Sequence, residues 1–290
     1  MKFSIITTSF NGSNYLRQCL DSVRDQEGVE LEHIVTDACS TDETLTMLDA
    51  FQAEVEVLQS KGELKGYSFL YLSEPDKGMS EGINKGLRQA SGDWWMWLNT
   101  DDYFEAGALL KVQQFIESRQ DADVVYGGFH FINAEGKIYR SPDALPYNRQ
   151  MVIYYGCYFA STAIFYRSSS TLARGEFIHE RFKQVMDHEY YARLGALKLK
   201  FYPMRNVRVA SFRVHGDNTS MRHNTATDID GILTRQLQLA ESVAVRRAYG
   251  VTPFKLPLAN AAFDFYVFMW FRLLKILFEV SVRLSFRRNN

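Results

Sequence analysis

Apolar runs with the spacing of strands and of helices alternate along the first hundred residues. Short β-branched and aromatic runs predict strands, and segments whose apolar residues recur every three or four positions predict helices. The expected strands are 3–8, 31–36, 69–73 and 94–98, and the expected helices are 14–26, 40 to about 51, and 79–90. Such alternation is typical of an α/β fold whose mostly parallel sheet is flanked by helices. Ser40 and Glu43 have the spacing of a capping box.

The second half of the chain has a different pattern. Residues 54–66 are expected to be a loop or short strand, and a helix is expected from about 105 to 119. Further strands are expected at 124–126, at 129–132 and 137–140 as a hairpin, at 161–167 and ending at Phe212, with a helix at 187–194. Because no linker separates the two halves, we expect one catalytic domain over residues 1–225.

A helical extension is expected over residues 226–258, with a helix at 229–249 that Gly250 and two prolines end. Residues 259–290 predict an amphipathic helix with a wide apolar face and a basic stripe formed by Arg272, Lys275, Arg283 and Arg287. Such helices lie in the membrane interface, where basic side chains reach lipid phosphates. The alternative is a helix packed on the catalytic domain or in a homo-oligomer interface. The sequence contains no run of eighteen uncharged apolar residues, so a membrane-spanning helix is not expected.

Composition narrows the class of protein. A net charge of −1 gives no basic field of the kind that nucleic-acid binding favours, so no nucleic acid is expected as a partner. The three cysteines, Cys19, Cys39 and Cys157, form neither a metal pattern nor an obvious disulfide framework, which favours a reducing cytoplasm. The first apolar run is too short for a secretory signal.

Two adjacent carboxylates, Asp101 and Asp102, follow the apolar strand 94–98. Paired acids at the end of a buried strand are costly unless a cation or ligand compensates them. Open α/β sheets bind ligands at that edge, and an oxygen-rich site there suits Mg²⁺ or Mn²⁺ holding substrate phosphates. The alternative is a solvated acidic turn.

Three further segments follow strands or open helices. Thr8, Phe10 and Asn11 belong to a loop with one glycine that can approach a nucleotide, although an ordinary capped turn has the same composition. Asp37 can hydrogen-bond a base or ribose, or it can cap the next helix. The turn Asp76-Lys77-Gly78 can set a cation against a diphosphate or can be a surface turn.

Taken together, these segments resemble the family 2 glycosyltransferases, which share the Rossmann-like GT-A fold. The resemblance begins at Ser4–Asn11 and continues at Asp37–Thr44, where the family usually has Asp-Gly-Ser-Ser-Thr-Asp-Gly-Thr. It is closest at Glu74–Asp102, in which Asp76-Lys-Gly, Asn84-Lys-Gly, Ala90-Ser-Gly-Asp and Leu98-Asn-Thr-Asp-Asp match in order and spacing. A weaker match extends to about His215, and the tail after Ile229 lies outside it.

The resemblance implies an enzyme that transfers a sugar from a nucleotide diphosphate donor, usually with a divalent cation and with inversion at the anomeric carbon. It implies that Thr8, Asp37, Lys77 and Asp101 lie along the nucleotide and that Asp102 is the main protein ligand of the metal. Asn84 belongs to the same matched segment. Departures from the family at Ala38, Cys39 and Glu43 affect base selectivity more than the fold.

Inverting transfer needs a general base near the anomeric carbon. By resemblance, Asp187 aligns best with that base and Glu189 is the second candidate; the alternative is that Asp187 only N-caps the helix that follows. In similar enzymes a loop histidine closes over the diphosphate or metal, a role that His215 would fill here with Arg213 or Arg222 as phosphate partners. A structural loop histidine is the alternative.

The expected function is therefore transfer of a sugar to a glycan or lipid-linked acceptor, in assembly of a cell-surface polysaccharide or another glycoconjugate at the inner face of a membrane. One alternative is a sugar nucleotidyltransferase, which should have a glycine-rich loop with a basic residue after the first strand. Residues 8–13 contain one glycine and no Lys or Arg. The other is a non-catalytic nucleotide-sugar-binding domain, which predicts loss of acids that are all present.

Overall fold

The computed structural model describes residues 1–216, residues 229–250 and isolated positions between 259 and 276. The first half alternates strands and helices in the order β1 (Lys2–Ser9), α1 (Ser13–Arg24), β2 (Glu30–Asp37), α2 (Thr44–Ser60), β3 (Tyr67–Ser73), α3 (Met79–Gln89) and β4 (Trp94–Trp97). The chain continues with β5 (Tyr103–Phe104), α4 (Ala108–Ser118), β6 (Val124–Ile132), β7 (Ile138–Arg140), α5 (Arg149–Tyr155), β8 (Ile164–Arg167), α6 (Met186–Ala196), β9 (Phe201–Arg213) and α8 (Ile229–Tyr249).

All nine described strands form one sheet in the order β3-β2-β1-β4-β8-β6-β9-β5, with β7 paired to β6. Strands β1 to β4 are parallel, β8 is antiparallel to β4 and to β6, and β6 and β9 are parallel. The predicted α/β fold with a mostly parallel sheet is therefore confirmed. Arg222, residues 251–258 and most of the predicted C-terminal helix lie outside the described residues.

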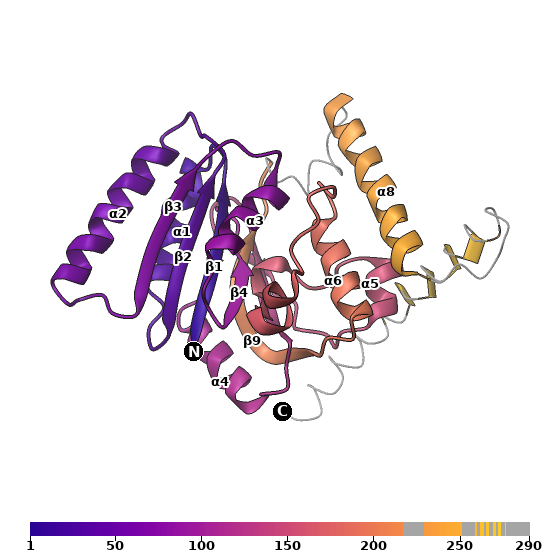
Figure 1. Cartoon of the computed structure of the whole chain (residues 1–290). Helices are drawn as coiled ribbons and strands as arrows, with labels where there is room; N and C mark the ends of the chain where they lie inside the picture. Colours follow the sequence, from indigo (N-terminus) through magenta and orange to yellow (C-terminus); the bar gives the residue numbers. More distant parts are fainter. Residues whose placement is uncertain are drawn as a thin grey trace.

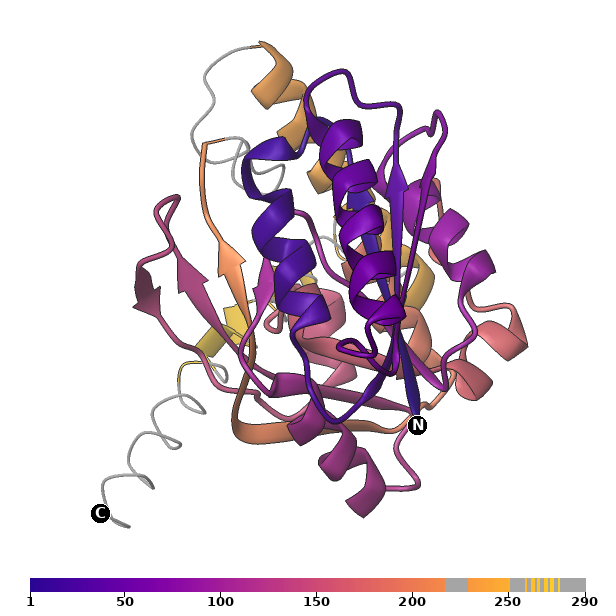
Figure 2. The ribbon, with the colours of Figure 1, turned by 90° about the vertical axis from the view of Figure 1, so that its left-hand side faces the viewer.

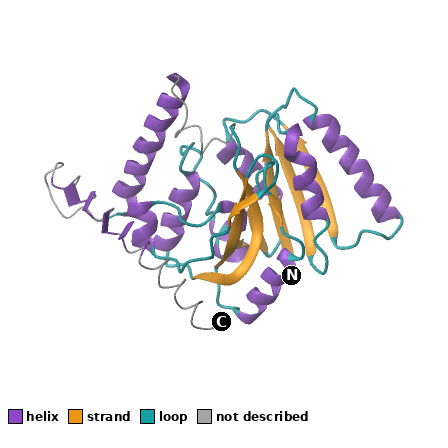
Figure 3. Ribbon diagram, turned by 180° about the vertical axis from the view of Figure 1, so that it is seen from behind, coloured by secondary structure: helices purple, strands orange, loops and turns teal. Residues whose placement is uncertain are grey.

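Helices cover both faces of the sheet (Figure 3). Helices α1, α2 and α4 pack on one face, where Ile5 and Met96 are buried, and α3, α5, α6 and α8 pack on the other, where Ile6 and Trp97 are buried. Figure 2 shows α1 and α2 lying in front of the strands. Burial on both faces explains why β4 is a continuous apolar run in place of an alternating one.

The structure corrects several local predictions. The capping box is wrong: α2 begins at Thr44 with no side-chain cap, and the Ser40 hydroxyl instead bonds Asp37. Helix α2 continues to Ser60 through residues expected to be a loop or strand. Strand β6 is continuous from Val124, and α5 and β5 were not predicted because both are too short for a clear period.

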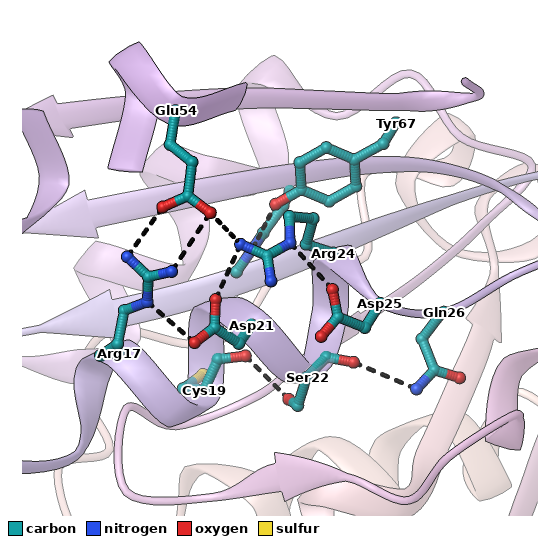
Figure 4. A network of polar contacts seen from close by, with 10 residues as sticks. Arg17, Cys19, Asp21, Ser22, Arg24, Asp25, Gln26, Glu54 and Tyr67 are labelled. Carbon is teal, nitrogen blue, oxygen red and sulfur yellow. Dashed lines mark hydrogen bonds and ion pairs between the residues drawn. The ribbon is translucent and has the colours of Figure 1, made fainter. Parts of the chain in front are cut away.

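A network of charged side chains joins α1 to α2 (Figure 4). Arg17 and Arg24 of α1 both form ion pairs with Glu54 of α2 and with Asp21 of their own helix. Both guanidinium groups also lie about 5.5 Å from the centre of the Phe51 ring. This network fixes the outer helix layer on the side of the sheet away from α6 and α8.

The Glu32 side chain connects several segments at the edge of the sheet where the parallel strands begin. This buried β2 side chain accepts hydrogen bonds from the Ser4 hydroxyl, from the backbone of Ser91 and Gly92, and from Lys2 through an ion pair. Burial alone would raise the pKa of Glu32, but these donors outweigh it and lower the pKa to about 2. The carboxylate form therefore stabilises the folded protein.

We predict that Glu32→Gln lowers the free energy of unfolding by about 2 kcal/mol at pH 7. Because the pKa in the folded state lies below the ordinary value of 4.5, this contribution is present above pH 4.5 and disappears as the pH falls towards 2. Urea unfolding of both proteins at pH 7 and near pH 3 measures this difference in the free energy of unfolding. Glu30→Gln, an exposed change on the same strand, is the control, and equal effects of the two changes would contradict the prediction.

Candidate active site

The carboxyl ends of β1, β2 and β4 lie at one edge of the sheet. Ser9 at the end of β1 is the register partner of Asp37 at the end of β2, and Asn99 to Asp102 follow β4 on the other side of β1. The strand order reverses here, because β1 leads to β2 on one side whereas β4 lies on the other. Open α/β sheets bind ligands at such a point.

Asp102 is the buried acid of this edge, with 1% of its surface exposed. Its Oδ1 accepts a hydrogen bond from the Arg213 backbone N–H at 2.9 Å, and its Oδ2 accepts one from the Asn99 amide at 3.3 Å. Burial raises the pKa of Asp102 well above its ordinary value, and the nearby charge of Asp101 raises it further. A cation at this carboxylate would relieve both costs.

His215 and Asp101 form the second part of the acidic site. The His215 Nε2 lies 3.0 Å from Oδ2 of Asp101, and the His215 ring lies 5.1 Å from the ring of Tyr15. The structure therefore brings together three residues that were singled out from the sequence, Asp101, Asp102 and His215. No sequence signal marked Tyr15 as a neighbour of the site.

Arg213 supports this acidic site from inside the protein. It is 2% exposed, its Nε donates to the Asp101 carbonyl at 3.0 Å, and its Nη1 donates to the Ala134 carbonyl at 2.8 Å. The guanidinium also lies 4.4 Å from the Tyr15 ring centre. These contacts hold the loop that carries Asp101 against the end of β9.

Asp37 is 2% exposed, and hydrogen-bond donors surround its carboxylate. Its carboxylate accepts from the Ser40 N–H at 2.9 Å, from the Ser40 hydroxyl, and from the Ser73 hydroxyl at 2.8 Å. Asp37 therefore organises the turn after β2 but does not cap the next helix, because α2 has no side-chain cap. A carboxylate offers about four acceptor positions, so these contacts still leave capacity for a base or ribose.

The turn before α3 faces Thr8. Gly78 has φ 123°, a conformation that favours glycine, and its N–H donates to Asp76 at 2.8 Å. A Cβ on Gly82 would lie 3.0 Å from Asp76 Oδ2 and 3.1 Å from Thr8 Cγ2, so glycine lets these two residues approach each other. Lys77 is exposed.

Phe10, Asn11 and Asn84 have different surroundings. Phe10 is 64% exposed, and Asn11 accepts from the Thr41 N–H at 2.8 Å. Asn84 is buried, and its amide nitrogen donates to the Ile178 carbonyl at 2.8 Å while its oxygen accepts from the Ile178 N–H at 3.0 Å. Asn84 therefore fastens α3 to the segment that leads to α6.

Asp187 lies in the first turn of α6, where its Oδ1 accepts from the His188 N–H at 2.7 Å. The N-cap position is Val185, and the helix has no side-chain cap of its own, so the alternative that Asp187 is the N-cap is wrong. Burial raises the pKa of Asp187, against the His188 N–H and the thiol of Cys157, which lower it. No sequence signal marked Cys157 as a neighbour of Asp187.

Glu189, the second base candidate, is completely buried. Its carboxylate accepts from Arg193 Nε at 3.0 Å and from the Tyr249 hydroxyl. These contacts occupy Glu189 inside the fold, whereas Asp187 is only half-buried.

Two absences concern the described residues alone. In residues 1–216 and 229–250 and the isolated positions beyond them, no group of three or more His, Cys, Asp or Glu side chains is arranged to hold a metal ion. Within the same part of the chain, none of the helices has the length and hydropathy needed to cross a membrane.

The model of the family described as Glycosyl transferase family 2 matches residues 4–177. Because this range is more than half of the chain, the protein belongs to family 2 of the glycosyltransferases, as the resemblance predicted. The matched range contains the acidic pair and the nucleotide-site candidates from Thr8 to Asn84, and it ends before α6, His215 and α8.

Curated relatives match over a shorter range. The chain is 32% identical over 126 residues to the PGL/p-HBAD biosynthesis glycosyltransferase of Mycobacterium tuberculosis, which is 43% of this chain and 45% of that protein. It is 28% identical over 138 residues to the poly(ribitol-phosphate) beta-N-acetylglucosaminyltransferase TarS of Staphylococcus aureus, which is 47% of this chain and 22% of that protein. The matches thus span less than half of the length of these relatives.

Solved structures share the fold. S. aureus TarS 1–349 in complex with UDP-GlcNAc has a TM-score of 0.58 at 18% identity, covering 86% of this chain and 73% of that one. The mannosyltransferase PcManGT from Pyrobaculum calidifontis, in complex with GDP-Man and Mn²⁺, has a TM-score of 0.55 at 14% identity, covering 97% and 86%. The predicted GT-A fold is therefore confirmed.

Proposed function

We propose that the protein is an inverting glycosyltransferase that moves a sugar from a nucleoside diphosphate donor to an acceptor hydroxyl. The observation that carries the proposal is the pair of acidic sites that the fold provides. One is the buried Asp102 with Asp101 at the carboxyl edge of the sheet, and the other is Asp187 at the start of α6. Donor phosphates with a cation need the first, and activation of an acceptor hydroxyl needs the second.

The proposed donor is a nucleoside diphosphate sugar. Family membership supports this proposal, as do the complexes of two proteins with the same fold, TarS with UDP-GlcNAc and PcManGT with GDP-Man. We assign Thr8, Asp37, Lys77 and Asp101 to the nucleotide side of the site. Release of nucleoside diphosphate from a panel of nucleotide sugars in the presence of Mn²⁺ tests the proposal. No release and no thermal stabilisation with any donor would favour a non-catalytic domain, whereas release of pyrophosphate from a sugar phosphate and a nucleoside triphosphate would indicate a nucleotidyltransferase.

The residues at the sheet edge fit a divalent cation. Asp102 is a buried carboxylate beside a second carboxylate, and hard oxygen ligands are those that Mg²⁺ and Mn²⁺ prefer. We propose that Asp102 is the main protein ligand, with Asp101 beside it and with His215 closing the site. When bound, such an ion neutralises the diphosphate and stabilises the charge of the leaving group.

The proposed base is Asp187. It takes the proton of the acceptor hydroxyl as that oxygen forms a bond to the anomeric carbon, and the bond to the diphosphate oxygen breaks with its electrons on the leaving group. Burial, which raises the pKa of Asp187, makes its carboxylate a stronger base than an exposed one. Glu189 is less suited because Arg193 and Tyr249 occupy it.

For the acceptor we propose a glycan or lipid-linked molecule at the cytoplasmic face of a membrane. Six large apolar residues of the C-terminal segment are between 46% and 66% exposed, namely Phe265, Tyr266, Met269, Trp270, Leu273 and Ile276. Their spacing places them on one side of a helix, and a wide exposed apolar face beside basic residues favours peripheral membrane attachment over packing on this domain.

We predict that binding of UDP or GDP requires a divalent cation through Asp102, because a nucleotide adds negative charge to an acidic site. Calorimetric titration with Mn²⁺ and with chelator measures the difference. Asp102→Asn should abolish the metal dependence yet keep the fold, since its amide can pair with the buried Asn99 oxygen that has no hydrogen-bond partner among the described residues. Equal affinity with and without metal in the unsubstituted protein would contradict the prediction.

We predict that Asp187→Asn lowers the rate of transfer by roughly 10²–10⁴ and leaves nucleotide binding nearly unchanged. Because burial raises the pKa of this carboxyl, the acid limb of the rate profile should lie above the ordinary aspartate range and should be absent in Asp187→Asn. Glu189→Gln is the matched comparison, and a loss confined to that variant would move the base to Glu189. NMR of the product anomer checks inversion.

We predict that the segment from about Ala259 to Phe286 attaches the protein to anionic membranes without crossing them. Each basic residue near such a surface contributes about 1 kcal/mol, and salt weakens that contribution. Flotation with anionic vesicles should recover the full chain but not a chain ending near Leu258, and Trp270→Glu should weaken recovery at full length. If the shortened chain floats equally well, or if truncation instead changes the oligomeric mass, the segment is a packing helix.

A further inference from the structure

Helix α8 lies beside α6 and α5 on the second face of the sheet (Figure 1), beyond the range that the family model matches. Two of its side chains reach α6. The buried Glu241 contacts the residues just before α6, and the Tyr249 hydroxyl donates to Glu189 in its first turn. Val245, between them, is completely buried. The contacts therefore tie α8 to the helix that carries Asp187.

Glu241 accepts hydrogen bonds from three consecutive backbone N–H groups. Its Oε1 accepts from Lys183 at 2.8 Å, and its Oε2 accepts from Gln184 at 2.8 Å and from Val185 at 3.1 Å. Val185 is the N-cap of α6, and α6 has no side-chain cap within its own segment. A carboxylate at a helix N-terminus satisfies unpaired N–H groups and interacts favourably with the helix dipole. Glu241 thus holds the N-cap residue of α6 and the two residues before it from another helix, and it places a negative charge near the N-terminus of α6.

The loop that Glu241 holds, residues 182–185, also contacts the donor side of the site. The Lys183 Nζ donates to the Lys77 carbonyl at 2.7 Å, and the Ser80 hydroxyl of α3 donates to the Phe182 carbonyl at 2.8 Å. One short loop therefore contacts the turn before α3 at one end and leads directly into Asp187 at the other. Its position sets where the Asp187 carboxylate lies relative to the Lys77 turn.

We propose that Glu241 is a positioning residue, which places Asp187 for transfer by fixing the loop 182–185. The inference rests on the proposed role of Asp187 as the base. This positioning role makes α8 part of the active site as well as of the hydrophobic core. A displacement of about 1 Å at a catalytic group costs on the order of 10²-fold in rate, so a loosened loop should act on turnover more than on donor binding.

The test compares Glu241→Gln and Glu241→Ala with two controls on α8. Gln236→Ala changes an exposed side chain, and Val245→Ala weakens the packing of α8 without touching the contacts of Glu241. With UDP-GlcNAc and GDP-mannose as probes and Mn²⁺ present, we expect kcat for release of UDP or GDP to fall roughly 10- to 100-fold in the Glu241 variants with KM little changed. A comparable fall in Val245→Ala would show that only stability matters and would overturn the proposal.

A double variant separates positioning from other roles. If Glu241 acts through Asp187, Glu241→Gln should cause little further loss in the Asp187→Asn background, whereas independent effects multiply. Multiplied losses would overturn the proposal. If Asp187→Asn alone leaves turnover unchanged, the proposed base is wrong. If Asp187→Asn is inactive but Glu241→Gln turns over normally, the base assignment stands and only the role of Glu241 is wrong.

Hydrogen exchange gives a readout that needs no substrate. The amides of residues 183–188 should exchange faster in Glu241→Gln, while those of β1 and α1 stay unchanged, because the loss of acceptors frees the loop locally. Unchanged protection of residues 183–188 would show that Glu241 does not fix this loop.

Discussion

The hydrogen bond from the Arg213 backbone to the Asp102 carboxylate joins the two halves of the sheet at the site. Asp102 follows β4, the last strand of the parallel half, whereas Arg213 ends β9 in the mixed half. Strand β5, directly after Asp102, pairs with β9. The acidic pair therefore keeps its place only while both halves are folded, and the guanidinium of Arg213 adds contacts to the Asp101 and Ala134 carbonyls.

Burial of Asp102 beside Asp101 has an energetic cost. A carboxylate that is 1% exposed and lies beside another acid destabilises the fold in its charged form, as the raised pKa of Asp102 expresses. Glu32 at the opposite edge of the sheet is also buried, but its donors lower its pKa. The fold thus compensates the buried Glu32 with hydrogen-bond donors but leaves the pKa of Asp102 raised, and perturbed pKa values of this kind cluster at functional sites.

The surroundings of the proposed base, Asp187, depend on a different kind of contact. Asp187 and Glu189 are two residues apart in one helix, yet their surroundings separate them, because Glu189 bonds Arg193 and Tyr249 while Asp187 lies at the half-buried start of the helix. Part of that separation comes from α8. A helix outside the matched family range therefore affects both acids, one through Glu241 and the loop before α6 and the other through Tyr249.

The sequence by itself determined the parallel half of the fold and the residues that follow its strands. Short runs of apolar and β-branched residues predict β1, β2 and β4, and the carboxyl ends of parallel strands have to meet at one edge, which brings Asp37 and Asp102 to the same side. The extension of α2 to Ser60 and the short α5 were missed because local patterns there are weak. Only the tertiary structure decided how the acids differ. Burial, the Arg213 contact at Asp102 and the reach of Glu241 across from α8 to Val185 join residues 56 to 111 positions apart, and no local spacing specifies such contacts.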